Sequence, residues 1–452
     1  MNRAVCGLTE SWRDNYNSGW PMSGRRDFLK TVAGAAAAGF PAIVPSSVLG
    51  RDGAIAPGDR ITVACIGTGW QGGNNVQSFL EEPGAQVVAA CDIDSEHLEA
   101  ARQTINTKYG NQDCKTYRFF EEVLARKDID AVMLAVPDHW HGTLSTAAAA
   151  AGKDIYGEKP LAHNFAEGQA IVAAVERYDR VWQTGSWQRS RDDFRFACEL
   201  VRNGRIGRVS RAKIVLPGGL TDFDGLGNHD SPVPPPKTLD YERWLGPAPE
   251  APYCPARVHK TWRWNLDYGG GMLMDWVGHH VDTAHWGLGF DKTGPVEVEG
   301  HGEFLRSHRV WNAPSRFRVN ARYPNGVMLE ISGGYETQRG VTWYGDEGWI
   351  WVDRSGIDAR PRSILMNKIR PDEIRFERST NHHRQFLECV KTRRRTLAPA
   401  DIALRSATPG YLGLISILTG TKIRWDPDQQ RILNNPTAER LLSRPMRGLW
   451  HV

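Results

Sequence analysis

Residues 61–72 read ITVACIGTGWQG, an apolar and partly β-branched run that ends in the pattern Gly67-x-Gly69-x-x-Gly72. In that pattern the first glycine permits a tight turn, the second lets the backbone approach a pyrophosphate, and the third allows a helix to pack closely on the strand. A helix is expected to follow at once, and its N-terminal N–H groups are suited to hold the pyrophosphate. The stretch therefore predicts the start of a dinucleotide-binding domain.

A second predicted strand, AQVVAACDID, supplies the acid that this kind of domain uses. Asp92 comes twenty residues after Gly72, which is the spacing of the carboxylate that binds the ribose hydroxyls. A carboxylate repels a 2′-phosphate, and no arginine follows in DIDSEH to accept one, so the sequence favours NAD over NADP. The candidate cofactor contacts at this end are Gly67, Gly69, Trp70, Gln71, Gly72 and Asp92.

Strand and helix patterns keep alternating as far as the strand in VWQTG, which predicts an α/β fold with an open, mostly parallel, doubly wound sheet. In such sheets ligands bind at the carboxyl ends of the strands. Two predicted loops at such ends carry polar residues. Pro137, His139 and His141 follow one strand, and Glu158 and Lys159 follow the next. All five are candidate cofactor contacts.

The motifs GTGWQGG, CDID, VPDHWH, AGKDIYGEKPL and YGGGMLMDWVGHHVD resemble those of the Gfo/Idh/MocA oxidoreductases, over roughly residues 58–425. That family includes glucose–fructose oxidoreductase and inositol dehydrogenase. The resemblance implies an N-terminal Rossmann domain and a C-terminal α+β domain, whose large open mixed or antiparallel sheet forms a dimer or tetramer interface. It also implies that Lys159 lies beside the nicotinamide and touches the reacting hydroxyl, with a cis peptide bond before Pro160.

Within GGGMLMDWVGHHVDTAHW, Asp275 and His279 are four residues apart and share one face of the predicted helix with Asp282. Oxidising a carbinol carbon also removes the hydroxyl proton, and an imidazole that titrates near neutrality suits that step. The resemblance gives this role to His279 and has Asp275 orient the sugar or its neighbour, while the Lys159 ammonium can stabilise alkoxide charge. One alternative is a helix whose polar residues only satisfy one another in the core. Another is a metal site, but His280 points about 100° away on a helix, so we predict none.

Other residues are weaker candidates for binding the substrate. Gln188 and Arg189 follow the last Rossmann strand, and Trp264 is one of 17 tryptophans, of the flat kind that carbohydrates favour. His383 precedes RQFLECVKT, where the family often has a histidine near the site. The charges in RVHKTWRWNLDYGGG either recognise an acidic or heavily hydroxylated sugar or only cover the surface. The Pro-rich stretch before them is expected to be a long loop, either a lid or an oligomer contact.

The N-terminal segment is expected to direct export. Arg25 and Arg26 stand ahead of FLK, which resembles a twin-arginine signal; the alternative is a chance pair before a buried helix. The apolar run at 31–44 is shorter than the about 20 residues that a membrane-spanning helix needs. We therefore expect a periplasmic or otherwise exported protein without a transmembrane span. The expected boundaries are 1–50 for signal and linker, 57–185 for the NAD-binding domain, 186–430 for the substrate and oligomerisation domain, and 431–452 for a C-terminal tail.

Composition limits the other partners. A formal net charge of +4 over 452 residues is too mild to indicate nucleic acid. The seven cysteines include no CxxC pair, so the sequence indicates neither a zinc knuckle nor a redox pair. A twin-arginine substrate folds in the reducing cytoplasm, so no disulfides are expected even after export.

An exported enzyme meets no dependable pool of free NAD, so we expect it to carry its cofactor and to regenerate it on the protein. Oxidation of one sugar coupled to reduction of another meets this demand, and a sugar oxidoreductase is the leading hypothesis. The alternative is NAD-dependent glycoside hydrolysis or lysis by transient oxidation and elimination, although such glycosidases typically show a different helix motif. A non-catalytic sugar- or NAD-binding protein is third, because Lys159, Asp275 and His279 are all present.

Overall fold

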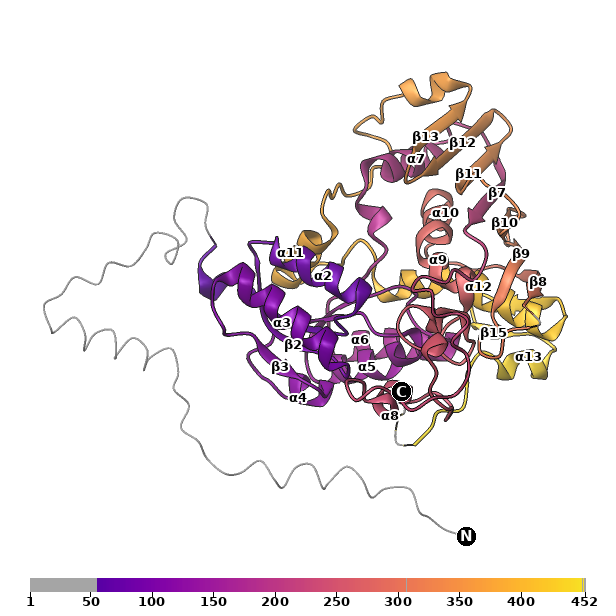
Figure 1. The fold of residues 1–452 in the computed structure, drawn as a ribbon. Helices are drawn as coiled ribbons and strands as arrows, with labels where there is room; N and C mark the ends of the chain where they lie inside the picture. The colour runs from indigo at the N-terminus through magenta and orange to yellow at the C-terminus, as the bar shows by residue number, and fades with distance from the viewer. Residues whose placement is uncertain (1–54, 306, 449, 451–452) are drawn as a thin grey trace, which may run out of the picture. The chain divides into compact units, whose positions relative to one another are not determined.

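The computed structural model describes residues 55–305, 307–448 and 450. The predicted export signal, with Arg25 and Arg26, lies outside these residues. Among the helices that are described, none is both long and apolar enough to cross a membrane. The described residues contain two sheets, each with its own helices (Figure 1).

The first sheet has six parallel strands in the order β3-β2-β1-β4-β5-β6. This is the strand order of dinucleotide-binding domains, and it confirms the predicted Rossmann sheet. The central strand β4 is apolar and buried along its whole length, and β1 is buried over its last four residues, as helices on both faces require. The strands are β1 (Ile61–Ile66), β2 (Ala85–Cys91), β3 (Lys115–Tyr117), β4 (Ala131–Leu134), β5 (Asp154–Gly157) and β6 (Trp182–Thr184).

The helices of this domain begin in two different ways. Asp94 caps α3, because its carboxylate accepts the N–H of Glu96 at 3.0 Å. Gly69 precedes α2 and has no side chain to offer, so the first N–H groups of α2 stay open to a ligand. The helices are α2 (Trp70–Leu80), α3 (Ser95–Tyr109), α4 (Phe120–Leu124), α5 (Asp138–Ala150) and α6 (Phe165–Arg177), with the 3-10 helix η2 (Pro57–Asp59) ahead of β1.

The second sheet has nine strands in the order β13-β12-β11-β7-β10-β9-β8-β14-β15. Strands β7 and β10 are parallel, and the other pairs are antiparallel, which confirms the predicted large mixed sheet. Its strands are β7 (Val209–Leu216), β8 (Glu297–Phe304), β9 (Pro314–Arg322), β10 (Met328–Gly333), β11 (Gly340–Gly345), β12 (Gly348–Asp353), β13 (Gly356–Arg360), β14 (Ile423–Asp426) and β15 (Arg431–Ile432).

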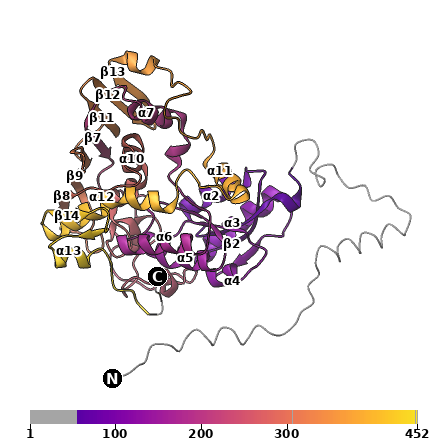
Figure 2. The same ribbon diagram turned by 180° about the vertical axis from the view of Figure 1, so that it is seen from behind.

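A helical layer lies between the two sheets. Helix α9, the π-helix η6 and α10 follow one another without a break, and α12 packs against both α6 and β8. Helix α7 lies against β12 in both views (Figures 1 and 2). The remaining helices are η3 (Trp187–Ser190), α7 (Asp192–Arg202), α8 (Tyr241–Leu245), η4 (Pro255–Arg257), η5 (Thr261–Trp264), α9 (Gly271–Trp276), η6 (Val277–Val281), α10 (Asp282–Leu288), η7 (Arg362–Met366), α11 (His382–Thr392), α12 (Ala400–Thr419) and α13 (Pro436–Arg440).

Residues 217–268, which we call the wall segment, connect β7 to the helical layer. The segment contains no strand of either sheet, but it carries its own buried apolar cluster, which includes Trp244, Trp262 and Tyr268. Three main-chain hydrogen bonds fasten it to the Rossmann domain, from Ser95 N–H to Thr238 O at 2.9 Å, from Asp240 N–H to Ile93 O at 3.1 Å and from His139 N–H to Tyr268 O at 3.2 Å. The predicted long loop is therefore an ordered wall beside the first sheet.

Helix α11 does not follow the predicted domain boundary. Although residues 382–392 fall inside the range expected for the substrate domain, Phe386 packs on the Rossmann core with Phe79 and Tyr156, at ring-centre distances of 6.2 and 5.8 Å. Figures 1 and 2 both show α11 beside α2. The predicted C-terminal tail also departs from expectation, because it contains β15 and α13, and Arg444 pairs with Glu167 at 2.8 Å.

Candidate active site

A cavity of about 820 Å³ lies at the carboxyl ends of the Rossmann strands. Gly67, Asp92, Pro137 and Lys159, which follow β1, β2, β4 and β5, all line it. The wall segment and the helical layer form its other sides. Its volume lies within the range of small-molecule sites.

The end of the cavity near β2 fits a dinucleotide. The Asp92 carboxylate accepts the N–H of Thr68 at 2.7 Å and that of Asp94 at 2.9 Å, which fixes the glycine loop against β2. A Cβ at Gly72 would lie 1.9 Å from the Gly67 carbonyl oxygen, so only glycine permits this turn. An open helix N-terminus, a bare glycine loop and a carboxylate together match the pyrophosphate and ribose of NAD.

Lys159 lies where the cofactor end meets the helical layer. Its Nζ donates to the side-chain oxygen of Asp275 at 2.9 Å and to the main-chain oxygen of the same residue at 2.8 Å. An ammonium has three N–H donors, so one remains for a ligand. The Lys159–Pro160 peptide bond is cis, as the resemblance implied.

Asp275 is held ionised by two cations. Its Oδ1 accepts from Lys159 and, at 3.1 Å, from Arg263 Nε. Burial would raise the pKa of Asp275, but Lys159 and Arg263 outweigh burial and lower the pKa to about 2. Asp275 is therefore a fixed negative charge that orients Lys159.

His279 lines the same cavity from the π-helix η6, a rare element that often marks functional sites. Gly278 lets this helix approach the lysine, because a Cβ there would lie 2.8 Å from the Cβ of Lys159. Burial, followed by the positive charges of Lys159 and Arg354, lowers the pKa of His279 well below its ordinary value. This direction favours a neutral imidazole at pH 7 and a titration below the near-neutral range expected from the sequence.

Asp138 is a site residue that the predicted list of contacts missed. It is 4% exposed, begins α5 and lines the cavity. Burial raises the pKa of Asp138 well above the ordinary range and outweighs the positive charge of Arg263, which lowers it. The raised pKa favours the neutral acid, which is a hydrogen-bond donor. Its position after β4 is the same signal that marked Pro137, His139 and His141, but that signal does not show which of these side chains faces the cavity.

Arg354 was also missed, and no local motif marks it. Its guanidinium carbon lies 4.7 Å from the ring centre of Trp187 and 4.5 Å from that of Trp276. Both tryptophans line the cavity and flank His279, with ring centres 6.3 and 5.5 Å from the imidazole. Within the described part of the chain, no carboxylate lies within 4.0 Å of the Arg354 guanidinium, so this cation is open to the cavity.

The predicted cofactor contacts divide into two groups. Those that line the cavity are Gly67, Gly69, Trp70, Gln71, Asp92, Pro137, Glu158 and Lys159. Gly72, His139 and His141 do not line it, and Gly72 instead packs inside the turn against the Gly67 carbonyl oxygen. The Nε2 of His139 lies 2.9 Å from the Trp244 carbonyl oxygen, and the ring nitrogens of His141 lie 2.7 and 2.9 Å from the carbonyl oxygens of Pro160 and Val136. Their imidazoles hold neighbouring main chain in place and do not reach the cofactor end.

Four predicted substrate contacts likewise lie outside the cavity lining, and these predictions are corrected as follows. The Arg189 guanidinium forms a buried ion pair with Asp282, at 2.7 and 2.8 Å, so Asp282 does not share the cavity face with Asp275. The π-helix η6 between Asp275 and Asp282 changes the α-helical spacing, on which the prediction that they share one face depended.

Gln188, Trp264 and His383 also lie outside the cavity lining. The Gln188 amide oxygen accepts from Thr283 Oγ1 at 3.3 Å, and Trp264 Nε1 donates to a main-chain oxygen of the wall segment at 2.9 Å. The His383 ring stacks on Tyr156 in the Rossmann core, with ring centres 4.7 Å apart. Each has a structural partner that its sequence position did not reveal.

Two family models match the chain. One, described as an oxidoreductase family with an NAD-binding Rossmann fold, matches residues 61–186. The other, described as the C-terminal alpha/beta domain of an oxidoreductase family, matches residues 199–452, more than half of the chain.

Individual proteins are also similar. The uncharacterized oxidoreductase YrbE of Bacillus subtilis is 23% identical over 77% of this chain and 91% of that protein. A glycosyl hydrolase family 109 protein of Shewanella pealeana is 31% identical, over 34% of this chain and 37% of that protein. The crystal structure of an aldose-aldose oxidoreductase from Caulobacter crescentus has a TM-score of 0.61 at 20% identity and covers 81% of this chain and 99% of its own. This last likeness concerns the fold.

Proposed function

Because this chain belongs to the Gfo/Idh/MocA oxidoreductase family, we propose that it oxidises a carbinol carbon of a carbohydrate, with NAD as the acceptor. The observation that carries the proposal is the meeting of Lys159, Asp275 and His279 in the cavity whose other end fits a dinucleotide. The similarity of part of the chain to a glycosyl hydrolase family 109 protein supports a carbohydrate as the substrate.

Lys159 would bind the hydroxyl that reacts. Two of its three N–H donors are taken by Asp275, and the third is free to donate to the substrate oxygen. The ammonium charge then stabilises the negative charge that develops on this oxygen as its proton leaves. Asp275 keeps the lysine in place throughout, because its low pKa holds it ionised.

His279 would accept the hydroxyl proton. A neutral imidazole is the form that can act as a base, and Trp187 and Trp276 flank the His279 ring in the cavity wall. The neutral Asp138 carboxyl would donate a hydrogen bond to another hydroxyl of the sugar. When NAD is bound it takes up the hydride, so one C–H and one O–H bond break and a carbonyl forms.

The net reaction that we propose is balanced in redox, with NAD retained and regenerated by reduction of a second sugar. Glycoside cleavage is the second candidate, because a family 109 glycosyl hydrolase is 31% identical over 34% of this chain. It would begin with the same oxidation, which acidifies a neighbouring C–H bond, so that the glycosidic substituent leaves with that proton. Water would then add to the resulting double bond, and re-reduction of the carbonyl would complete the hydrolysis.

We propose further that the protein is exported by the twin-arginine route and that its open nine-stranded sheet forms a homo-oligomer. Outward side chains alternate with buried ones along β9, so the second sheet has a face outside the core. Light scattering during gel filtration tests the assembly, and a monomer at micromolar concentration would contradict it.

The experiment that tests the function uses the protein with its own cofactor. The nucleotide released on denaturation is identified, and the native protein is then screened with sugars and aryl glycosides without added NAD. Lys159→Met keeps much of the side-chain length but removes the N–H donors, so turnover should fall about 10²–10⁴-fold while NAD stays bound. The exposed Lys108→Met is the matched control. Sugar conversion that survives Lys159→Met would refute the assignment of this site.

A further inference from the structure

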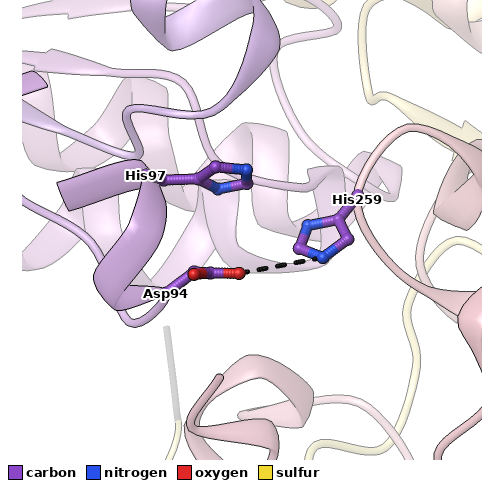
Figure 3. A group of neighbouring side chains, drawn as sticks. All are labelled: Asp94, His97 and His259. Atoms are coloured by element: carbon purple, nitrogen blue, oxygen red, sulfur yellow. Dashed lines mark ion pairs between the residues drawn. The ribbon is translucent and has the colours of Figure 1, made fainter. Parts of the chain in front are cut away.

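Three potential metal ligands meet beside the cofactor end of the cavity. Asp94 and His97 stand at the start of α3, and His259 comes from the wall segment (Figure 3). One ligand atom of each lies within 4.8 Å of the others, and all three residues line the cavity. The sequence places His97 and His259 far apart, so no spacing rule could have joined them.

Each residue of this cluster has a potential ligand atom that forms no hydrogen bond with another described residue. Asp94 Oδ1 caps α3, but Oδ2 is turned to His259 Nε2, 3.8 Å away. Neither His97 nor His259 has a side-chain hydrogen bond to any described residue, whereas other histidines in this protein do. His141 and His382, for example, both have ring nitrogens within 2.9 Å of oxygen partners.

The surroundings favour a cation. The carboxylate of Asp92 lies two residues before Asp94, and it accepts the Asp94 N–H at 2.9 Å. His259 has a positive φ of 55°, a left-handed conformation that costs a residue other than glycine about 1 kcal/mol or more. If this part of the wall segment only covered the cavity, His259 would not need this strained main-chain conformation.

We propose that Asp94, His97 and His259 form a binding site for a divalent transition metal ion, with Zn²⁺ as the best match. Two imidazole nitrogens and one carboxylate oxygen are a common zinc ligand set, which leaves a fourth position for water. Zinc bond lengths near 2.0–2.1 Å place tetrahedral ligand atoms about 3.4 Å apart. The 3.8 Å between Asp94 and His259 is already close to this value, and small side-chain rotations bring in His97.

The ion would join two parts of the chain that come together only in the folded protein. Asp94 and His97 belong to the Rossmann domain, and His259 belongs to the wall segment, so the metal ties the wall across the cavity. This role is independent of the proposed sugar oxidation, because it needs neither Lys159 nor His279.

The test measures metal binding directly on the NAD-loaded protein. After treatment with a chelator, Zn²⁺ is titrated by calorimetry, and melting temperature and amide hydrogen exchange are recorded with and without the ion. We expect one equivalent to bind, the Tm to rise, and exchange to slow across residues 255–265.

Variants locate the site. Asp94→Asn retains a good helix cap, so the fold is kept while the anionic ligand is lost. It and His259→Gln should each weaken Zn²⁺ binding at least about 100-fold, since even outer-shell changes cost 10–100-fold. His301→Gln, on the exposed part of β8, should leave binding unchanged. The proposal is overturned if the wild type binds no stoichiometric Zn²⁺, or if Asp94→Asn and His259→Gln bind it as the wild type does.

Discussion

Gly278→Ala tests whether the close approach of the π-helix to Lys159 sets the geometry of catalysis. The new Cβ would lie 2.8 Å from the Cβ of Lys159, whereas carbon atoms in contact prefer about 3.5–4.0 Å. Because the Cβ of Lys159 is anchored to the main chain, the helix and the lysine must separate by about 0.7–1.2 Å. A misplacement of about 1 Å can cost about 10²-fold in rate, and we expect a loss of that size in kcat.

The effect on stability separates this cause from simple helix propensity. Replacing a glycine within a helix by alanine normally stabilises a protein by about 0.5–1 kcal/mol, whereas overpacking costs about 1–3 kcal/mol. Gly278→Ala should therefore lower the free energy of unfolding by about 1 kcal/mol. Gly73→Ala in α2 is the matched control, since the nearest atom to its Cβ is the Thr68 carbonyl oxygen at 3.6 Å, an ordinary contact.

The assay follows single-turnover reduction of the bound NAD, using the sugar found in the screen, and thermal unfolding of both variants. Gly278→Ala should be slower and less stable, and Gly73→Ala should retain its activity and gain stability. If Gly278→Ala turns over at the wild-type rate and melts at a higher temperature, the approach of η6 to Lys159 does not control the reaction.

Three other results are expected. Only a neutral His279 accepts a proton, so turnover should be full above its lowered pKa and lost below it, with the acid limb of the pH–rate profile below pH 6.5. Arg354→Met removes a positive charge that lowers this pKa, so the acid limb should move to higher pH. An acid limb that stays at the same pH in Arg354→Met would contradict this reasoning. Asp92→Ala should weaken NAD more than NADP in equilibrium binding, because it removes the ribose partner and the repulsion of a 2′-phosphate together. Replacing Arg25 and Arg26 by lysine should leave active protein in the cytoplasm, and normal periplasmic yield of that variant would refute the export signal.

The sequence predicted those parts of the fold that depend on local patterns. The glycine turn and Asp92 belong to one strand–helix–strand unit, so the number of residues between them in the sequence predicts that they meet in the site. Lys159 was recognisable because it ends a strand, and such ends meet at one edge of a parallel sheet.

Other parts depend on packing that local patterns do not express. The residues that begin α5 all follow β4, and this position alone does not show which of their side chains face the cavity. The side chain of Asp138 lines the cavity, whereas those of His139 and His141 turn to main-chain oxygens. The π-turn before Asp282 breaks the α-helical spacing that the prediction assumed. Arg354 reaches the site from the end of β12, through a sheet pairing that only the tertiary fold establishes.

The return of α11 to the Rossmann domain also sets an order of events during synthesis. Phe79 and Tyr156 are covered by Phe386, yet β6 ends at Thr184 and α11 begins only at His382. At about 5–20 residues per second, the ribosome needs roughly 10–40 seconds to cross that interval. Throughout this time one apolar face of the nascent NAD-binding domain has no native cover. The NAD-binding domain can therefore complete its native packing only after α11, which is encoded late in the message, has been synthesised.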